Sequence, residues 1–410
     1  MIRPVSFCVI GLVCVVAHVL IGSSTVAHHC FSSCSAQEQD ETKPSDNKPQ
    51  QGTKNPDGSF PDTKGSIAAG LTFLMRQQAD DGAWHSQHYG SMRQGAAVTA
   101  FALYSISHLP DEARAPHVEG FKKAVDFLKL GIEKRGCVSA PDGSMDYPVY
   151  STALILTVHK KLDIGLTATQ VKRMVQFLLD SQCNESRGFT PDNANLGGWD
   201  ILGPGSTEGK TAGANVSVTF YVLEALSLYQ ADKIFKDDRV KTSIAAARTW
   251  CDLIVKTSST DGFYFTSEIR SNLNKAGWAK DEQPRVYGTA TCDGLGILLH
   301  TGSEKDSEAV KQTLAWLVKN RQVDQVPGFT DEESNWPSSL RFYYLTALSR
   351  SLNLFEPDFA IKQRKSIAQL LVDSQAKTGF WKSDFNQMRE NDPLIATSFA
   401  LIALANVGLR

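Results

Sequence analysis

Asp293 is the one acidic residue in the string Tyr287–Gly294, which otherwise consists of apolar, small and hydroxyl side chains. A carboxyl group in an apolar site keeps its proton to a higher pH, so Asp293 is a candidate proton donor or ligand-orienting group. The alternative is a structural aspartate that caps a helix or accepts buried hydrogen bonds. The sequence leaves both interpretations open.

Other polar residues stand in or beside similar apolar segments. Arg341 adjoins Phe342 and is a candidate to bind an anionic ligand or to pair with Asp293, with a structural salt bridge as the alternative. Glu224 interrupts another apolar segment, where a buried structural pair is the simpler interpretation. Three tyrosines at or near the starts of such segments also belong to the candidate ligand-binding set: Tyr150, Tyr287 and Tyr343.

Three tryptophans lie in long insertions that precede apolar segments: Trp199, Trp278 and Trp336. If these insertions share one face of the fold, the three rings form an aromatic rim at a cavity mouth. Such a rim can hold an isoprenoid or stack on a sugar ring. Ordinary packing within the loops is the alternative.

Charge and ligand spacing restrict the partners. The chain has 42 Lys and Arg against 44 Asp and Glu, whereas nucleic-acid binding needs a basic surface, so we expect no nucleic-acid partner. The histidines and cysteines form no set of three or four ligands with metal-site spacing, so we expect no metal and no cofactor.

A repeated motif positions these residues. Phe73–Leu74 is followed at fixed intervals by Gln78, Gly82 and Trp84, and Leu370–Leu371 is followed at the same intervals by Gln375, Gly379 and Trp381. Looser copies begin at four further places: Phe127, Phe177, Leu253 and Trp316. In the copy after Phe177, Gln182 is present and we assign Gly188 and Phe189 to the glycine and aromatic positions. Glutamine can bridge to the next repeat, glycine permits a tight turn and the aromatic ring packs between repeats.

Each copy lies between two helical patterns. The preceding pattern is amphipathic, as in 240–254, where apolar residues recur every three or four positions. The following pattern is apolar on all sides, which indicates a fully buried helix, at residues 96–106, 149–158, 216–229, 289–299, 340–348 and 394–407. Six buried inner helices covered by six outer helices predict an all-α (α/α)6 toroid of six helical hairpins. An open solenoid is the alternative, but it would expose one side of the inner helices.

The motif resembles the QW motif of the squalene cyclase and protein prenyltransferase superfamily, in a single-toroid, bacterial-type form. Tyr287–Gly294 and Tyr343–Leu348 are similar to segments of bacterial prenyltransferase and squalene oxidase repeat proteins. The resemblance covers residues 64–410 and implies one toroid. Related triterpene cyclases carry an Asp-x-Asp-Asp acid motif, for which Asp293 is the nearest stand-in. Related prenyltransferase β subunits hold zinc with Asp-x-Cys and a His, whereas here the order is Cys292–Asp293.

Three functions are compatible with these features. The resemblance and the apolar inner helices favour a toroid that binds an apolar, isoprenoid-like ligand in a central cavity. A terpenoid cyclase or isomerase with Asp293 as general acid is the first alternative. An (α/α)6 polysaccharide-acting enzyme, which needs two facing carboxylates, or an interaction scaffold is the second.

The first 63 residues have a different character. Residues 1–36 show the basic start, apolar run and small polar residues of a secretory signal peptide, with a retained membrane anchor as the alternative. Residues 37–63 are almost wholly polar and predict a disordered linker. We therefore expect an exported protein, periplasmic or secreted, which remains membrane-tethered if the signal is retained. After signal cleavage we expect no transmembrane segment.

Export would permit disulfides in the toroid. Cys137 and Cys183 lie in successive loops and are candidates to pair. Cys251 and Cys292 lie in apolar helical patterns, which favours buried free thiols.

Overall fold

The structure is a computed structural model that describes residues 60–204, 213–232, 235, 238–258, 260–280, 282–330 and 334–408. The predicted signal peptide, 1–36, and most of the predicted linker, 37–63, lie outside these residues. The described chain is helical and contains isolated β-bridges but no β-strand. None of its helices has the length and apolar character that a membrane span requires.

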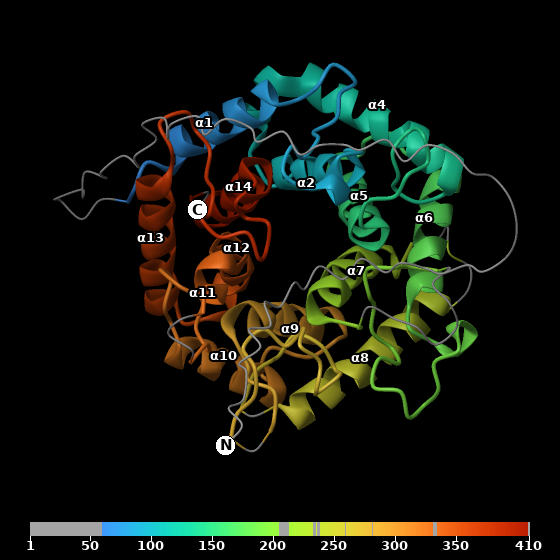
Figure 1. The fold of residues 1–410 in the computed structure, drawn as a ribbon, viewed down its shortest axis with the longest axis vertical. Coiled ribbons are helices and arrows are strands. Elements are labelled where there is room, and N and C mark those ends of the chain that lie inside the picture. The colour runs from blue at the N-terminus through green and yellow to red at the C-terminus, as the bar shows by residue number, and fades with distance from the viewer. Residues whose placement is uncertain are drawn as a thin grey trace, which may run out of the picture. The chain divides into compact units, whose positions relative to one another are not determined.

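Six inner helices form a closed ring. Each packs against the next along the chain, and the last packs against the first, which excludes the open solenoid (Figure 1). Nearly all of their side chains are buried, because the helices contact neighbours on every side. The inner helices are α2 (Ala96–Ile106), α5 (Pro148–Leu162), α7 (Val216–Tyr229), α9 (Gly288–His300), α12 (Arg341–Ser351) and α14 (Pro393–Gly408).

Six amphipathic outer helices cover the ring, so the predicted toroid of six hairpins is confirmed. In α8, Val240, Ile244 and Ala247 are buried while Arg248 and Asp252 form a partly exposed ion pair. The outer helices are α1 (Thr63–Arg76), α4 (Val118–Arg135), α6 (Ala168–Ser181), α8 (Arg239–Thr257), α10 (Glu308–Lys319) and α13 (Pro357–Ser374). Short helices are α3 (Asp111–Arg114), α11 (Trp336–Ser339) and the 3-10 turns Gly90–Met92, Ala115–His117, Glu185–Arg187 and Leu352–Leu354.

Three glutamines join neighbouring outer helices. Each donates from Nε2 to the carbonyl of a nearby glycine and to a carbonyl of another outer helix at 2.8–3.0 Å. The donors are Gln78, Gln182 and Gln375, and the carbonyls across the interface belong to Gly120 on α4, Ser243 on α8 and Ser66 on α1. The contact from Gln375 to α1 joins the last hairpin to the first, which helps to close the ring.

In the third copy of the motif, the structure places Trp199 at the aromatic position that the sequence analysis assigned to Phe189. Gln182 binds the carbonyl of Gly197, not of Gly188, and the aromatic position two residues later is therefore Trp199 instead of Phe189. The Trp199 indole is buried and donates to the carbonyl of Leu178 at 2.7 Å. Trp84 and Trp381 make the equivalent bonds, to Leu74 and Leu371. Trp199 thus packs between hairpins and does not belong to a cavity rim.

Threonines on inner helices hold the loops that precede them. The backbone N–H of Trp84, Trp199 and Trp381 each donates to a threonine Oγ1 one turn into the following inner helix. Val138 and Phe263 do the same in two further hairpins. The accepting residues are Thr99, Thr152, Thr219, Thr291 and Thr397. These bonds satisfy buried loop amides that would otherwise cost free energy.

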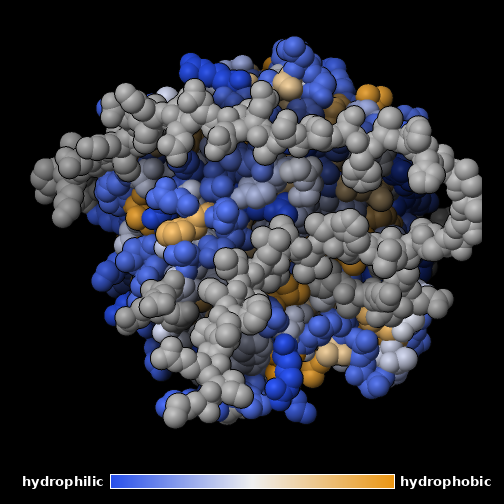
Figure 2. Space-filling model, in the orientation of Figure 1, coloured by the Kyte–Doolittle hydropathy of each residue, from blue (hydrophilic) through white to orange (hydrophobic). Residues whose placement is uncertain are grey.

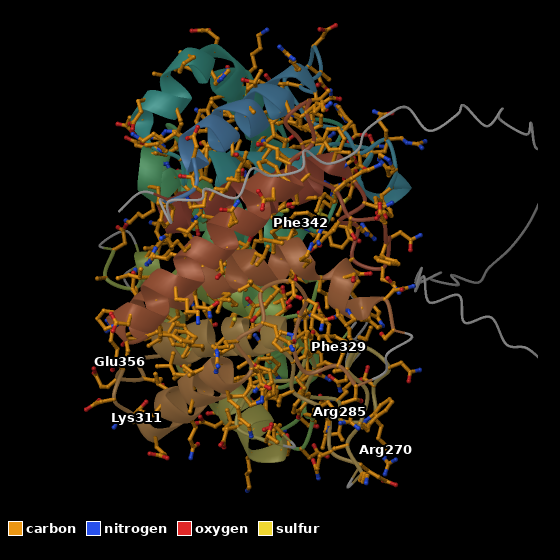
Figure 3. All side chains as sticks on the ribbon, turned by 90° about the vertical axis from the view of Figure 1, so that its left-hand side faces the viewer. Arg270, Arg285, Lys311, Phe329, Phe342 and Glu356 are labelled. Carbon is orange, nitrogen blue, oxygen red and sulfur yellow. The ribbon has the colours of Figure 1, made fainter. Side chains whose placement is uncertain are left out.

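The ring has two distinct faces (Figure 3). Arg270, Arg285 and Phe329, in loops that run from outer to inner helices, lie toward one face. Lys311 and Glu356, near the starts of outer helices, lie toward the other. The inner helices therefore begin at the face with the long loops. Figure 2 shows one face of the molecule as mainly hydrophilic with small hydrophobic patches, which fits apolar side chains buried inside the ring.

The four cysteines of the toroid are buried and form no disulfide: Cys137, Cys183, Cys251 and Cys292. The proposed pairing of Cys137 with Cys183 is therefore wrong. Burial also raises the pKa of the Cys137 thiol to about 11. A buried free thiol behaves as a small apolar side chain.

Candidate functional site

A cavity of about 290 Å³ lies inside the ring at the N-terminal turns of the inner helices. All six inner helices contribute to its wall, and the long loops supply the rest. Most of the lining is aliphatic or aromatic, including Phe101, Leu154, Phe265, Ile395 and Phe399. The position of the cavity follows from the topology, because six apolar helices surround one axis and their N-terminal turns lie at the face with the long loops.

Asp293 lies in the cavity wall on the second turn of α9 and is only 1% exposed. Its Oδ2 accepts a hydrogen bond from Tyr343 Oη at 2.5 Å, and its Oδ1 accepts one from Arg350 Nη2 at 2.8 Å. Burial raises the pKa of Asp293 to about 6, while Arg350, Tyr343 and Lys275 oppose the rise. The carboxylate therefore accepts hydrogen bonds from two donors, of which Arg350 is also its cation, and it is mainly ionised at neutral pH.

A chain of hydroxyl groups crosses the cavity wall and ends at Asp293. Tyr150 Oη donates to Ser217 Oγ at 2.7 Å, and Ser217 Oγ forms a short hydrogen bond with Tyr343 Oη. Tyr343 then donates to Asp293. Because the single proton of Tyr343 Oη is donated to Asp293, Ser217 donates to Tyr343. The hydrogen bonds therefore form one continuous chain from α5 through α7 and α12 to α9. Protons along this chain point toward the carboxylate.

Arg350, not Arg341, is the ionic partner of Asp293. Arg350 also lies against aromatic rings, with its guanidinium carbon 4.0 Å from the Phe220 ring centre and 5.3 Å from that of Tyr221. Arg341 instead lies over the ring of its neighbour Phe342, at 5.1 Å, and does not line the cavity. The sequence held a signal that both Tyr343 and Arg350 could reach Asp293, because they are seven residues apart and so lie on the same side of α12.

Glu390 is a second buried carboxyl group in the cavity wall, and sequence reasoning missed it. Its two oxygens accept from the backbone N–H groups of Phe342 and Tyr343, at 3.0 and 2.7 Å, at the first turn of α12. Burial raises the pKa of Glu390 to about 8, while these amides and the charge of Arg341 oppose the rise. Glu390 is in a loop before α14, where no local pattern indicated a buried acid.

Lys275 is a second cavity residue that the sequence did not indicate. Its Nζ lies 3.1 Å from the centre of the Phe265 ring and 5.8 Å from that of Trp336. Burial lowers the pKa of Lys275 to about 7, with Asp293 opposing the shift. Within the described part of the chain, Lys275 is in no hydrogen bond or ion pair.

The tyrosines and tryptophans predicted from the sequence separate into two groups. Tyr150, Tyr287 and Tyr343 line the cavity together with Asp293. Trp278 and Trp336 do not: Trp278 is 37% exposed and donates to the Ile269 carbonyl at 2.7 Å, while Trp336 is half-buried at the start of α11. With Trp199 buried between hairpins, the expected rim of three tryptophans does not form. The insertions fold onto separate neighbours, and tyrosines supply the aromatic wall.

Glu224 accepts a hydrogen bond from Tyr104 Oη at 2.7 Å, and it is not among the cavity-lining residues. This contact joins α7 to α2 and agrees with a structural role. Among the described residues, no group of three or more His, Cys, Asp or Glu is placed to hold a metal ion.

Comparison with known proteins places the fold. No family model and no curated protein sequence matches the chain. Among solved structures, the type II terpene cyclase MstE from Scytonema in its apo form is similar, with a TM-score of 0.55 at 14% identity, over 84% of this chain and 97% of that chain. The chain shares the terpenoid cyclase fold.

Similar structures with bound ligands come from two different kinds of enzyme, a terpene cyclase and a glycosidase. A variant of MstE in complex with geranylgeranyl dihydroxybenzoate, its substrate, has a TM-score of 0.53 at 14% identity and covers 84% of this chain and 97% of that chain. A glycosidase variant in complex with glucose has a TM-score of 0.52 at 14% identity, over 85% and 97% of the two chains. At 14% identity the similarity establishes the (α/α)6 toroid fold. The function has to be argued from the residues of the site.

Proposed function

We propose that the toroid binds an apolar molecule of isoprenoid type in the central cavity. The observation that carries this proposal is the cavity wall, which is built from aliphatic and aromatic side chains of all six inner helices. Its volume of about 290 Å³ lies near the lower end of the range for small-molecule sites, roughly 300–1,000 Å³. MstE, which shares the fold, was solved with a geranylgeranyl-bearing substrate.

Cavity filling tests this proposal. Ala97 lines the cavity on α2, so Ala97→Leu places extra volume where the ligand would lie. Ala245 is exposed on α8, and Ala245→Leu adds the same volume to the surface as a matched control. We expect the wild type and Ala245→Leu to bind farnesol in equilibrium dialysis and Ala97→Leu to bind at least tenfold more weakly. Equal binding by the three proteins, or none by the wild type, contradicts the proposal.

A sugar substrate is less well supported. Glycoside hydrolysis requires one carboxyl group as acid and a second as base or nucleophile. Of the two acids in this wall, Asp293 is held by Tyr343 and Arg350. Glu390 alone is then left as an acid, with no second carboxyl group to serve as base or nucleophile. A mainly apolar wall also offers a sugar few hydrogen-bonding partners, whereas sugar hydroxyls need many.

A second candidate function is cyclisation or isomerisation started by protonation of a double bond. This chemistry needs a carboxylic acid that is neutral at the working pH in an apolar site. Asp293, with its pKa at about 6 and its contact with Arg350, is mainly ionised at pH 7. Glu390, with its pKa at about 8, keeps its proton there. The candidate acid is therefore Glu390, in place of Asp293.

Incubation with squalene and with geranylgeranyl diphosphate tests the second candidate. The proteins to compare are wild type, Glu390→Gln and Asp293→Asn, with products separated by gas chromatography and mass spectrometry. A cyclised or isomerised product that disappears in Glu390→Gln and persists in Asp293→Asn supports Glu390 as the acid. Product formation that is unchanged in both variants contradicts acid catalysis by either carboxyl group.

A further inference from the structure

Lys275 brings a cationic group to an otherwise apolar part of the cavity wall. It lies in the loop between α8 and α9, with its Nζ 3.1 Å from the centre of the Phe265 ring. Lys275 is half-buried, and an ammonium group that loses part of its water is costly unless it is paired with an anion or lies against aromatic faces. The Phe265 and Trp336 rings offset part of this cost, but neither carries a charge that could neutralise the lysine.

The acids of the cavity wall form hydrogen bonds with groups other than Lys275. Asp293 is the acidic group that acts on Lys275 electrostatically, but its two oxygens bind Arg350 and Tyr343. Glu390, the other acid of the wall, accepts from backbone amides with both oxygens. The described cavity therefore contains one lysine without a counter-ion of its own.

Thr289 provides a second, independent sign of a polar ligand group. It is 2% exposed, lines the cavity on the first turn of α9, and its Oγ1 has no hydrogen-bond partner among the described residues. A buried hydroxyl left without a partner costs free energy. Lys275 and Thr289 are both donors, and the positive end of the α9 dipole lies at the same turn. The complementary ligand group is an acceptor with negative charge.

The positive charge available in the cavity wall limits how much negative charge the ligand can carry. Two arginines near the ligand space are already in contact with other groups. Arg350 binds Asp293. Arg389, which lines the cavity, lies 5.1 and 5.0 Å from the Tyr89 and Tyr147 ring centres and donates to Ser91. One lysine neutralises one charge, which suits a carboxylate and falls short of a diphosphate. The rest of the wall suits a hydrocarbon chain.

We propose that the natural ligand is an apolar carboxylic acid whose carboxylate binds Lys275 and Thr289, with its chain among the aromatic residues of the cavity. This inference rests on the proposed binding function and specifies the ligand class.

A matched pair of probes separates the head group from the chain. Farnesoic acid and its methyl ester carry the same hydrocarbon, and only the acid is an anion. We expect the wild type to bind the acid about 10- to 100-fold more tightly than the ester in equilibrium dialysis at pH 6, since a charged hydrogen bond contributes about 1.5–3 kcal/mol. Equal affinity for acid and ester overturns the head-group proposal, while binding of neither probe overturns the proposed function itself.

Two variants assign the residues. Lys275→Met keeps the length of the side chain and removes its charge, so we expect it to lose the preference for the acid and to keep its affinity for the ester. Lys280→Met changes an exposed lysine of the same loop and should behave as wild type. Thr289→Val should weaken acid binding several-fold with ester binding unchanged, which provides a second route if Lys275→Met folds poorly. A preference for the acid that survives in both Lys275→Met and Thr289→Val contradicts the assignment.

Discussion

Nη2 of Arg350 lies 2.8 Å from Oδ1 of Asp293, and this ion pair joins α12 to α9 beside the central cavity. Asp293 is almost fully buried, so its charge depends on this arginine and on Tyr343 for compensation. The pair explains why an acid in an apolar helix is tolerated without being a free proton donor.

Arg350→Met should destabilise the protein by about 3–5 kcal/mol at pH 7, because it leaves a buried carboxylate without its cation. The double variant Arg350→Met with Asp293→Asn should recover part of this loss. Urea unfolding measures the free energies, and Arg341→Met, on the same helix but away from Asp293, should cost less than about 1 kcal/mol. Losses that simply add in the double variant would show that the two residues are not coupled.

Tyr343→Phe should raise the pKa of Asp293 above about 6, because the Tyr343 hydroxyl stabilises the ionised carboxylate. The variant also cuts the hydroxyl chain between Ser217 and Asp293, so we expect a loss of about 1–3 kcal/mol in unfolding free energy. Carboxyl ¹³C chemical shifts of labelled aspartate, followed against pH, report the pKa. Tyr287→Phe, in the same cavity, is the control and should leave the titration of Asp293 nearly unchanged.

Trp199→Ala should destabilise the toroid by about 3–5 kcal/mol, since it empties a fully buried indole site between hairpins. Trp199→Phe should lose about 1–2 kcal/mol, mainly from the bond to the Leu178 carbonyl. Trp278→Phe, at an exposed position, is the control and should change stability by less than 1 kcal/mol. Farnesol binding should persist in Trp199→Phe, and its loss there without unfolding would restore a direct ligand role for Trp199.

Glu390 should make the protein less stable as pH rises. Its pKa is about 8 in the folded state against an ordinary value of 4.5, so the folded protein binds more protons between these values. The free energy of unfolding therefore falls from pH 4.5 to 8, by at most about 1.4 kcal/mol per pH unit from this group. Asp293 and Asp146, whose pKa values burial raises to about 6, act in the same direction at lower pH.

Glu390→Gln should remove this contribution and flatten the pH dependence between pH 6 and 8. Urea unfolding at pH 5, 6.5 and 8 provides the comparison, with Glu356→Gln at an exposed helix start as control. Parallel curves for wild type and Glu390→Gln would mean that Glu390 is ionised throughout this range, which would also remove it as a candidate acid.

The fold could be predicted from the sequence because its signals are local. Two inner helices, Ala96–Ile106 and Val216–Tyr229, begin and end at the predicted residues, since their all-apolar pattern is complete within each segment. The candidate site was predicted only in part. Asp293, Tyr150 and Tyr343 lie on inner helices, where periodicity indicated burial, and Tyr287 directly precedes one; the structure places all four in one cavity.

The remaining site residues depend on contacts that no local pattern encodes. Lys275 and Glu390 lie in loops, and they reach the cavity because the closed ring brings each loop over its axis. Trp199 takes the packing position of Trp84 because the chain between Gln182 and Gly197 forms an insertion whose length hid the correspondence.

The sequence by itself determined six hairpins, their buried and exposed faces, and an acid on the fourth inner helix. Only the tertiary structure decided that this acid is paired with Arg350 and that Glu390 is the buried carboxyl group with the higher pKa. It also decided that no acid among the described residues forms an ion pair with Lys275. The physical reason is that helix burial follows from side-chain periodicity along the chain, whereas pairing and pKa depend on which groups the closed ring brings together in an apolar space.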